Sequence, residues 1–223
     1  MSQKFHSLRV SSANCQGLQS KEKRRDVILY LKSKNYNIVC LQDTHWTKKD
    51  KESVKDIWGG ECFLHGMKSN SRGIAILLGT NFEYKVINHT EDREGNYLQI
   101  LLQLQTFTLN LITLYGPNKD NPNFFVKIHE ILEKNTADYT VLCGDFNFVM
   151  NPELDTQNYL HINNPRARCA LQNIIESENL VDIYRQTHPS TRRYTWRKRT
   201  PLKQARLDYF FSIRTYGRHN YCM

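Results

Sequence analysis

The stretch that decides the fold runs from Tyr139 to Phe148 and reads YTVLCGDFNF. Its apolar run, Val141–Cys143, predicts a strand buried on both faces, which Gly144 is expected to end. Asp145 and Asn147 would then emerge at the carboxyl end of a sheet strand, two apart and on one face. A carboxylate beside a carboxamide can take a proton from water while the amide donates to a phosphate oxygen. Asp and Asn are also the commonest residues of ordinary turns, so the alternative is a simple turn.

The N-terminal part of the chain repeats this arrangement of a strand that ends on a polar residue. The run Leu8–Ala13 predicts a strand that breaks at Asn14, residues Lys21–Lys34 form an amphipathic helix, and the apolar run Tyr36–Gln42 predicts a second buried strand that ends on Asp43. A strand, a helix and a strand at this spacing predict a parallel crossover. Asn14 and Asp43 should therefore meet at one edge of the sheet.

Asp43 is a candidate ligand for Mg²⁺, a hard cation that takes carboxylate and water oxygens. The alternative is a helix cap or a loop aspartate. His45 and Trp46, which follow, are expected to pack within the loop, because Mg²⁺ does not favour an imidazole ligand.

The middle of the chain predicts a hairpin and a second crossover. Asn96–Gln105 and Phe107–Tyr115 alternate around a tight turn, and Tyr115 stands at a strand end, where its hydroxyl could donate to a phosphate or its ring could simply pack. The helix Asn123–Lys134 then leads back to the opening strand. Further elements are expected at 48–56 and 166–178 as helices, and at 61–65, 73–79 and 180–184 as strands. This order is typical of two packed sheets flanked by helices.

The positive charge of the chain is concentrated in one stretch. The formal net charge is +9, and Arg185–Arg206 holds eight Lys/Arg and no Asp/Glu, which leaves 23 basic and 22 acidic residues elsewhere. A solvated basic loop is the plain interpretation. Aromatic residues interleaved with arginines favour nucleic-acid binding instead. The candidate DNA-binding residues there are Arg192, Arg193, Thr195, Trp196, Arg197, Lys198 and Arg199.

Asp208 is expected in the middle of an otherwise apolar strand, Ala205–Phe211. An ionised carboxylate is costly to bury without a partner, which favours a role in a site.

Composition excludes several classes of protein. The 223 residues form one expected domain, 1–223, and 39% of them are hydrophobic, enough for a sizeable core. The sequence contains neither a secretory signal nor a run long enough to span a membrane. Six scattered cysteines without C-x-x-C spacing indicate neither zinc nor disulfides. The sequence therefore predicts a soluble, monomeric, nuclear or cytoplasmic protein without a membrane partner.

Seven motifs, in order, carry a resemblance to a known family: S-A-N-C-Q-G, C-L-Q-D-T-H, R-G-I-A-I-L, L-Y-G-P-N, G-D-F-N, Y-T-W and R-L-D-Y. Together they resemble the endonuclease/exonuclease/phosphatase superfamily with the DNase-I-like fold. Within it the sequence is most similar to the apurinic-type endonuclease domain at the start of non-LTR (LINE-like) retrotransposon polyproteins. The resemblance implies a four-layer α/β sandwich with the active site between sheet edges.

The resemblance also implies roles for the matching residues. Asn14 and Asp43 would hold Mg²⁺, with Mn²⁺ as a substitute, and Asp145 would orient or deprotonate the attacking water. Asn147 and Tyr115 would bind the scissile phosphate, Asn118 and Thr195 would lie beside the DNA backbone, and Asp208 would orient a catalytic histidine.

Two departures from the family pattern are present. Asp43 stands where the family usually has Glu, so a metal must lie nearer the strand or bind through water. The family's terminal Ser-Asp-His strand does not follow Asp208, and His219 comes too early to replace its histidine. We therefore expect the fold to lack its last strand and Asp208 to lack its usual partner.

The sequence thus predicts a Mg²⁺-dependent endonuclease that nicks DNA and leaves a 3′-hydroxyl, which primes a reverse transcriptase domain of the same polyprotein outside this chain. The alternatives are an inactive DNA-binding remnant and an abasic-site repair endonuclease. A phosphoinositide phosphatase or sphingomyelinase is disfavoured, because the W-x-D-R signature of lipid-phosphate members is missing near Asp208.

Overall fold

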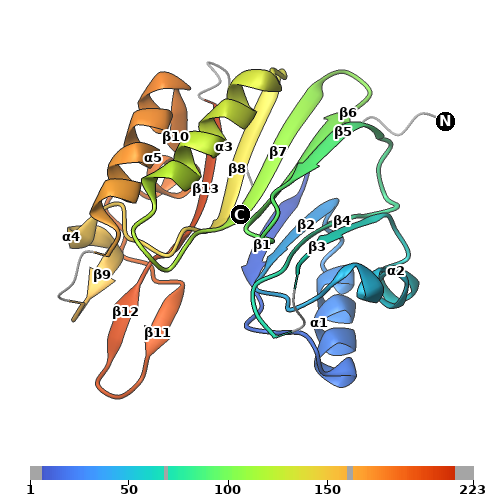
Figure 1. The fold of residues 1–223 in the computed structure, drawn as a ribbon, viewed down its shortest axis with the longest axis horizontal. Helices are drawn as coiled ribbons and strands as arrows, with labels where there is room; N and C mark the ends of the chain where they lie inside the picture. Colours follow the sequence, from blue (N-terminus) through green and yellow to red (C-terminus); the bar gives the residue numbers. More distant parts are fainter. Residues whose placement is uncertain (1–6, 68–69, 160–162, 214–223) are drawn as a thin grey trace.

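The computed structural model describes residues 7–67, 70–159 and 163–213. Its first sheet has the strand order β1-β2-β4-β3, in which β1 and β2 are parallel and the other pairs antiparallel. The helices α1 and α2 cover its outer face (Figure 1). The bounds are β1 Val10–Asn14, α1 Lys21–Ser33, β2 Ile38–Gln42, a short 3₁₀ helix Lys48–Asp50, α2 Lys51–Trp58, β3 Cys62–His65 and β4 Ile74–Leu78.

The second sheet has the order β10-β13-β8-β7-β6-β5, in which only β7 and β8 are parallel. The helices α3 and α5 pack on its outer face (Figure 1). The bounds are β5 Lys85–Glu91, β6 Tyr97–Gln103, β7 Thr108–Tyr115, α3 Pro122–Lys134, β8 Tyr139–Asp145, α5 Pro165–Ser177, β10 Leu180–Asp182, α6 Ile183–Thr187 and β13 Asp208–Ile213. Helices outside two packed sheets confirm the predicted four-layer sandwich.

A small third sheet, β11-β12-β9, extends beyond the ends of the two main sheets (Figure 1). Strands β11 and β12 form a hairpin, and β9 follows the four-residue helix α4. The bounds are α4 Pro152–Asp155, β9 Thr156–Gln157, β11 Trp196–Lys198 and β12 Lys203–Ala205. The C-terminal part of the predicted basic stretch is therefore a β-hairpin.

The core between the two sheets explains the apolar runs of the sequence. All five residues of Ile74–Leu78 are fully buried, and Ile38, Cys40 and Cys143 pack in the same cluster with side chains of β6 and β7. The β-branched and aliphatic runs are buried on both faces because the sheet has helices on one side and the other sheet on its opposite side. Both predicted parallel crossovers are present, β1-α1-β2 and β7-α3-β8.

The end of β8 differs from the prediction. The strand continues through Gly144 to Asp145, and Gly144 has φ +135° with Leu114 O only 2.0 Å from where a Cβ would lie. Because a side chain does not fit there, glycine at this position allows β7 and β8 to lie close together, and it does not end the strand. Asn147 has φ +57°. Asn147 lies near Asp145 because the chain turns after β8. The two residues were expected to share one face of a strand, but Asn147 is outside the strand.

Other boundaries also differ. Ile183 and Tyr184, expected in a strand, begin α6, and Asp208 starts β13 instead of lying in its middle. The polar edge strand β5 was not predicted, because an exposed edge strand lacks apolar alternation. The expectations of a missing last strand and of His219 as a poor substitute concern residues 214–223, which lie outside the described residues.

The described part of the chain contains five cysteines, and all five are free thiols. No helix within it is long and apolar enough to cross a membrane.

Candidate active site

The candidate active site lies where strands of both sheets end together. In the first sheet Asn14 ends β1 opposite Gln42, and Asp43 directly follows β2. In the second sheet Tyr115 ends β7 opposite Asp145, the last residue of β8. The parallel pairs bring carboxyl ends together within each sheet, and hydrogen bonds then join the two edges. Residues from four separate parts of the sequence are thus assembled by topology.

Asp145 is the centre of this assembly. Its Oδ2 accepts a hydrogen bond of 2.7 Å from Asn14 Nδ2, and its Oδ1 accepts one of 2.8 Å from the Asn147 backbone N–H. The side chain is almost fully buried, and burial raises the pKa of this carboxyl; the hydrogen bonds from Asn14 and Asn147 lower it, and the charge of Asp43 raises it further. A carboxylate that is fixed in position and made more basic is suited to receiving a proton from water.

Tyr115 and Asn147 present hydrogen-bond donors at the same edge. Burial is the main cause that raises the pKa of Tyr115, followed by the charges of Asp43 and Asp145, while hydrogen bonds with Asn147 and Asn118 lower it. The phenol therefore keeps its proton. Asn147 Nδ2 donates to Gly116 O at 2.5 Å, which fixes the amide and leaves its second hydrogen available.

His45 lies in the same loop as Asp43. Its Nε2 lies 3.1 Å from Asp43 Oδ1, a contact that the sequence did not indicate. Asp43 has φ +51° and His45 φ +60°, and this unusual backbone brings the imidazole back onto the carboxylate. Trp46 fulfils its prediction as a packing residue, because it is 1% exposed and its Nε1 donates to Leu18 O at 3.0 Å.

The residues present fit a hard divalent cation. Asn14, Asp43 and Asp145 offer amide and carboxylate oxygens, and the charge of Asp43 raises the pKa of Asp145, so negative charge gathers at this edge. The described residues contain no group of three or more His, Cys, Asp or Glu side chains with metal-binding geometry. Mg²⁺ needs only one or two carboxylates, because it keeps several waters of its own.

Asp208 lies directly opposite Asp145 in the pairing of β13 with β8. Burial, then the charge of Asp145, raise the pKa of Asp208 to about 7, while a hydrogen bond with Thr195 lowers it. Thr195 Oγ1 accepts hydrogen bonds from the backbone N–H groups of Leu207, at 3.0 Å, and of Asp208, at 3.2 Å. The hydroxyl thus anchors the base of the β11–β12 hairpin to the site.

The raised pKa of Asp208 makes a prediction about stability. The folded state binds more protons than the unfolded state between the ordinary pKa of 3.8 and about 7, so the free energy of unfolding falls as pH rises through this window. Asp208→Asn should remove that fall. Urea unfolding in EDTA at pH 5 and pH 8 should show a smaller difference between the two pH values for the variant than for the parent chain.

Asp138→Asn is the matched control, because hydrogen bonds with Thr108 hold the pKa of Asp138 below its ordinary value and outside that window. It should leave the difference between pH 5 and pH 8 unchanged. An Asp208→Asn variant with the same pH dependence as the parent would contradict the prediction.

The basic hairpin has the exposure that DNA binding requires. Trp196 is half-buried and packs edge-on against Tyr159, with ring centroids 5.9 Å apart. The other predicted DNA contacts of this stretch are exposed: Arg192, Arg193, Thr195, Arg197, Lys198 and Arg199. The Trp196 ring is thus oriented by packing while the cations face solvent.

The ends of the basic stretch correct the sequence interpretation. Arg206 is 3% exposed and donates through Nε to Asp155 Oδ1 at 2.9 Å, and Arg185 also pairs with Asp155, which is fully buried. Arg206 further pairs with Asp182. Arg185 and Arg206 are therefore part of a buried charge cluster at the base of the hairpin and do not belong to its exposed cations.

Comparisons with known proteins agree with the fold. Residues 11–212 match the Endonuclease/Exonuclease/phosphatase family. The chain is 27% identical over 210 residues to the "Transposon TX1 uncharacterized 149 kDa protein" of Xenopus laevis, which covers 90% of this chain and 16% of that protein. It is 25% identical over 212 residues to the "Exodeoxyribonuclease" of Bacillus subtilis, and the match covers 85% of this chain and 79% of that protein. The chain thus spans about a sixth of the transposon relative.

Solved structures show the same architecture. An AP endonuclease from Archaeoglobus fulgidus has a TM-score of 0.73 at 22% identity, over 92% of this chain and 86% of that one. The APE2 catalytic domain of Xenopus laevis has a TM-score of 0.74 at 17% identity, over 93% of this chain and 82% of that one. Because the family match spans nearly the whole described fold, the chain belongs to the Endonuclease/Exonuclease/phosphatase family.

Proposed function

We propose that this chain is a divalent-metal-dependent endonuclease that hydrolyses one phosphodiester of duplex DNA and leaves a 3′-hydroxyl. The observation that carries the proposal is the contact of Asn14 and Asn147 with the two carboxylate oxygens of Asp145, beside Asp43 and Tyr115. A positioned base, neutral donors and hard oxygen ligands together suit phosphoryl chemistry in water.

Asp145 acts as the base that orients the attacking water and takes its proton. Asn14 and Asn147 each donate a hydrogen bond to one of its oxygens, so the carboxylate is held in one orientation before the substrate binds. Its raised pKa strengthens it as a proton acceptor.

Tyr115 and Asn147 donate hydrogen bonds to the non-bridging oxygens of the scissile phosphate, with Asn118 beside them. Donors that are fixed before the substrate arrives contribute most when charge develops in the transition state. The contact of Asn147 Nδ2 with Gly116 O provides that rigidity. Asp208 lies across from Asp145 at the same edge, in the pairing of β13 with β8.

Asn14 and Asp43 would hold Mg²⁺ or Mn²⁺. A bound divalent ion supplies neutralisation of the phosphate charge and a lower pKa for water. His45 keeps Asp43 in place through the 3.1 Å contact between its Nε2 and Asp43 Oδ1.

The β11–β12 hairpin supplies DNA affinity. Exposed arginines and lysines neutralise phosphates, and Trp196 offers a ring for contact with sugar or base. Thr195 couples the hairpin to Asp208 through the backbone contact described above. The DNA held by the hairpin is thereby presented to the catalytic edge.

The biological setting that we propose is a retrotransposon polyprotein. The similarity to a transposon protein six times longer supports it, because the chain then corresponds to one domain among several. The 3′-hydroxyl left by the nick would prime a reverse transcriptase domain of the same polyprotein.

A plasmid assay tests the function. Purified protein should convert supercoiled DNA to open circles with Mg²⁺ or Mn²⁺, and EDTA should prevent this. A DNA polymerase should extend the nicks directly with labelled nucleotide, because polymerases need a free 3′-hydroxyl. Nicks that require a phosphatase before extension would contradict the proposed product.

Two other outcomes select the alternatives. Salt-sensitive DNA binding with no nicking under either metal would identify a binding module without hydrolytic activity. An oligonucleotide with one abasic site that is cut far faster than the intact duplex would identify a repair endonuclease.

A further inference from the structure

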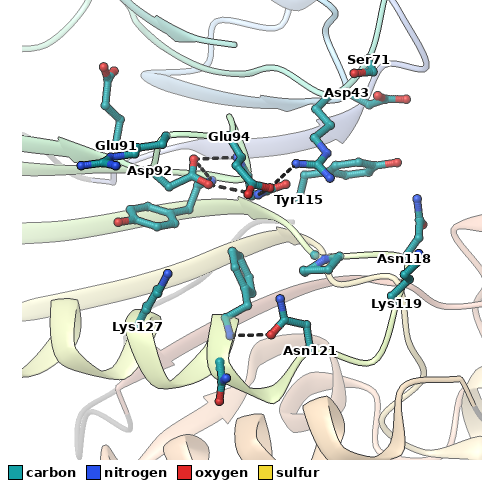
Figure 2. Close-up of a pocket in the computed structure, with 18 of the residues that line it drawn as sticks. Asp43, Ser71, Glu91, Asp92, Glu94, Tyr115, Asn118, Lys119, Asn121 and Lys127 are labelled. Atoms are coloured by element: carbon teal, nitrogen blue, oxygen red, sulfur yellow. Dashed lines mark hydrogen bonds and ion pairs between the residues drawn. The ribbon is translucent and has the colours of Figure 1, made fainter. Parts of the chain in front are cut away.

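A large pocket lies next to the candidate active site on the side away from the hairpin. Its volume is about 970 Å³, and Asp43, Tyr115 and Asn118 line it together with the β5–β6 loop, residues 70–72 and the start of α3. No described residue of the β11–β12 hairpin is part of the lining. In Figure 2, Glu91, Asp92 and Glu94 lie on one wall and Lys119, Asn121 and Lys127 on the other. The pocket is therefore a second surface beside the candidate active site, separate from the hairpin.

Two of the three acidic residues on the first wall are already engaged inside the protein. Asp92 accepts hydrogen bonds from the backbone and side chain of Asn96, at 2.8 and 3.0 Å. Glu91 pairs with Lys48 at 2.9 Å and contacts His65 at 3.1 Å. These carboxylates stabilise the loop and are held by their own partners. Glu94 is the acidic residue of this wall that faces a pocket-lining cation.

Glu94 pairs with Arg72 across the pocket mouth. Arg72 Nη1 lies 2.5 Å from Glu94 Oε2, and the two side chains are 44% and 62% exposed. Hydrogen bonds from Arg72 and then from Asn96 lower the pKa of Glu94, and the charge of Lys127 adds to this effect. An ion pair this exposed contributes little stability, because water and salt screen it, so another anion can replace Glu94 as the partner of Arg72.

The backbone of Arg72 is fixed against the catalytic loop. Arg72 has φ +57°, its carbonyl oxygen accepts a 2.7 Å hydrogen bond from His45 N–H, and Gly73 O accepts one of 3.0 Å from Thr44 N–H. The loop that carries Asp43 and the loop that carries Arg72 therefore move as one unit. Only the Arg72 side chain has to rotate to leave Glu94.

We infer that Arg72 is a DNA-backbone contact on the pocket side of the cut, and that Glu94 holds its guanidinium until a phosphate replaces the carboxylate. The inference rests on the proposed function and adds a positioning residue to it. A guanidinium suits this exchange, because its planar fork binds carboxylate and phosphate in the same bidentate manner. Lys119 and Lys127, on the opposite wall, add positive charge to the same path.

Binding of a fluorescent 20-base-pair duplex in EDTA tests the inference without DNA cutting. Arg72→Ala should weaken binding about 3- to 10-fold near 0.1 M salt and reduce the slope of log K against log salt by about 1, because one phosphate contact is lost. Glu94→Gln should tighten binding, because it releases the arginine and removes a negative charge. If the ion pair were purely structural, Arg72→Ala and Glu94→Gln would change the affinity for the duplex in the same direction.

Glu178→Gln is the matched control. It makes the same change of charge at Glu178, whose Oε1 lies 2.8 Å from His129 Nε2. Neither Glu178 nor His129 lines the pocket. Glu94→Gln should tighten binding more than Glu178→Gln, and should lose that advantage in the Arg72→Ala background. This comparison separates a local effect on Arg72 from a general gain in positive charge.

Three results would overturn the inference: an unchanged salt slope for Arg72→Ala, equal effects of Glu94→Gln and Glu178→Gln, or weaker binding by Glu94→Gln. If thermal unfolding shows that Arg72→Ala does not fold, the comparison of duplex binding by Glu94→Gln and Glu178→Gln tests the inference by itself. If the parent chain nicks plasmid DNA, any of these three results overturns the inference about Arg72 but leaves the proposed function intact. A parent chain that neither binds nor nicks duplex DNA removes both.

Discussion

Asp145→Asn is expected to lower the rate of plasmid nicking by about 10²- to 10⁴-fold, the range in which a positioned acid or base contributes. The asparagine has nearly the same shape but cannot take a proton. It also has a single oxygen for the donors Asn14 Nδ2 and Asn147 N–H, which now share two. Binding of the duplex should persist, since a negative charge beside the phosphate has been removed.

Asp138→Asn is the matched control for this variant. Asp138 precedes the same strand at its other end, and its Oδ2 accepts hydrogen bonds from the backbone and hydroxyl of Thr108 at 2.7 and 2.8 Å. The same chemical change there should leave nicking within about twofold, since surface substitutions have small effects. If Asp145→Asn retains more than a tenth of the parent rate, the role of Asp145 as base is refuted.

The assembly of this site was largely predictable from the sequence, because parallel crossovers impose it. Asn14 and Asp43 follow two strands joined by a helix, and such strands must be neighbours that end at one edge. Tyr115 and Asp145 follow the same rule in the second sheet. The hydrogen bond between Asn14 and Asp145, which joins the two sheets, spans 131 residues and could be expected only from the resemblance.

What the sequence could not show depends on backbone conformation and distant partners. His45 reaches Asp43 because both residues have positive φ, which neither residue type specifies. Arg185 and Arg206 add to a basic stretch when charges are counted along the chain. Their partner Asp155 lies 30 and 51 residues away, and only the fold reveals that these two charges are internal.

This buried charge cluster gives the largest expected effect on stability. Arg206 is held by both oxygens of Asp155, at 2.9 and 3.1 Å, and by Asp182, and its guanidinium carbon lies 4.3 Å from the Tyr209 ring centroid. Arg206→Met should lower the free energy of unfolding by about 3–5 kcal/mol, the cost of removing one partner from a buried ion pair. Methionine fills a similar volume, so the loss reflects charge rather than a cavity.

Arg166→Met is the matched control, and urea unfolding is the measurement. Arg166 pairs with Asp120 at 3.1 Å but is 74% exposed, so the same substitution should cost about 0–1 kcal/mol. Equal losses in the two variants would contradict the argument from burial.

A second substitution tests whether the excess negative charge is the cause. In Arg206→Met, Asp182 loses its arginine partner, while Asp155 keeps Arg185. Adding Asp182→Asn should restore part of the lost free energy, because one carboxylate then faces one arginine. Asparagine can still accept the hydrogen bond from Arg185 N–H that Asp182 accepts at the start of α6, so the helix cap is kept. A further loss of stability in the double variant would show that packing around Arg206, and not its charge, holds the base of the hairpin.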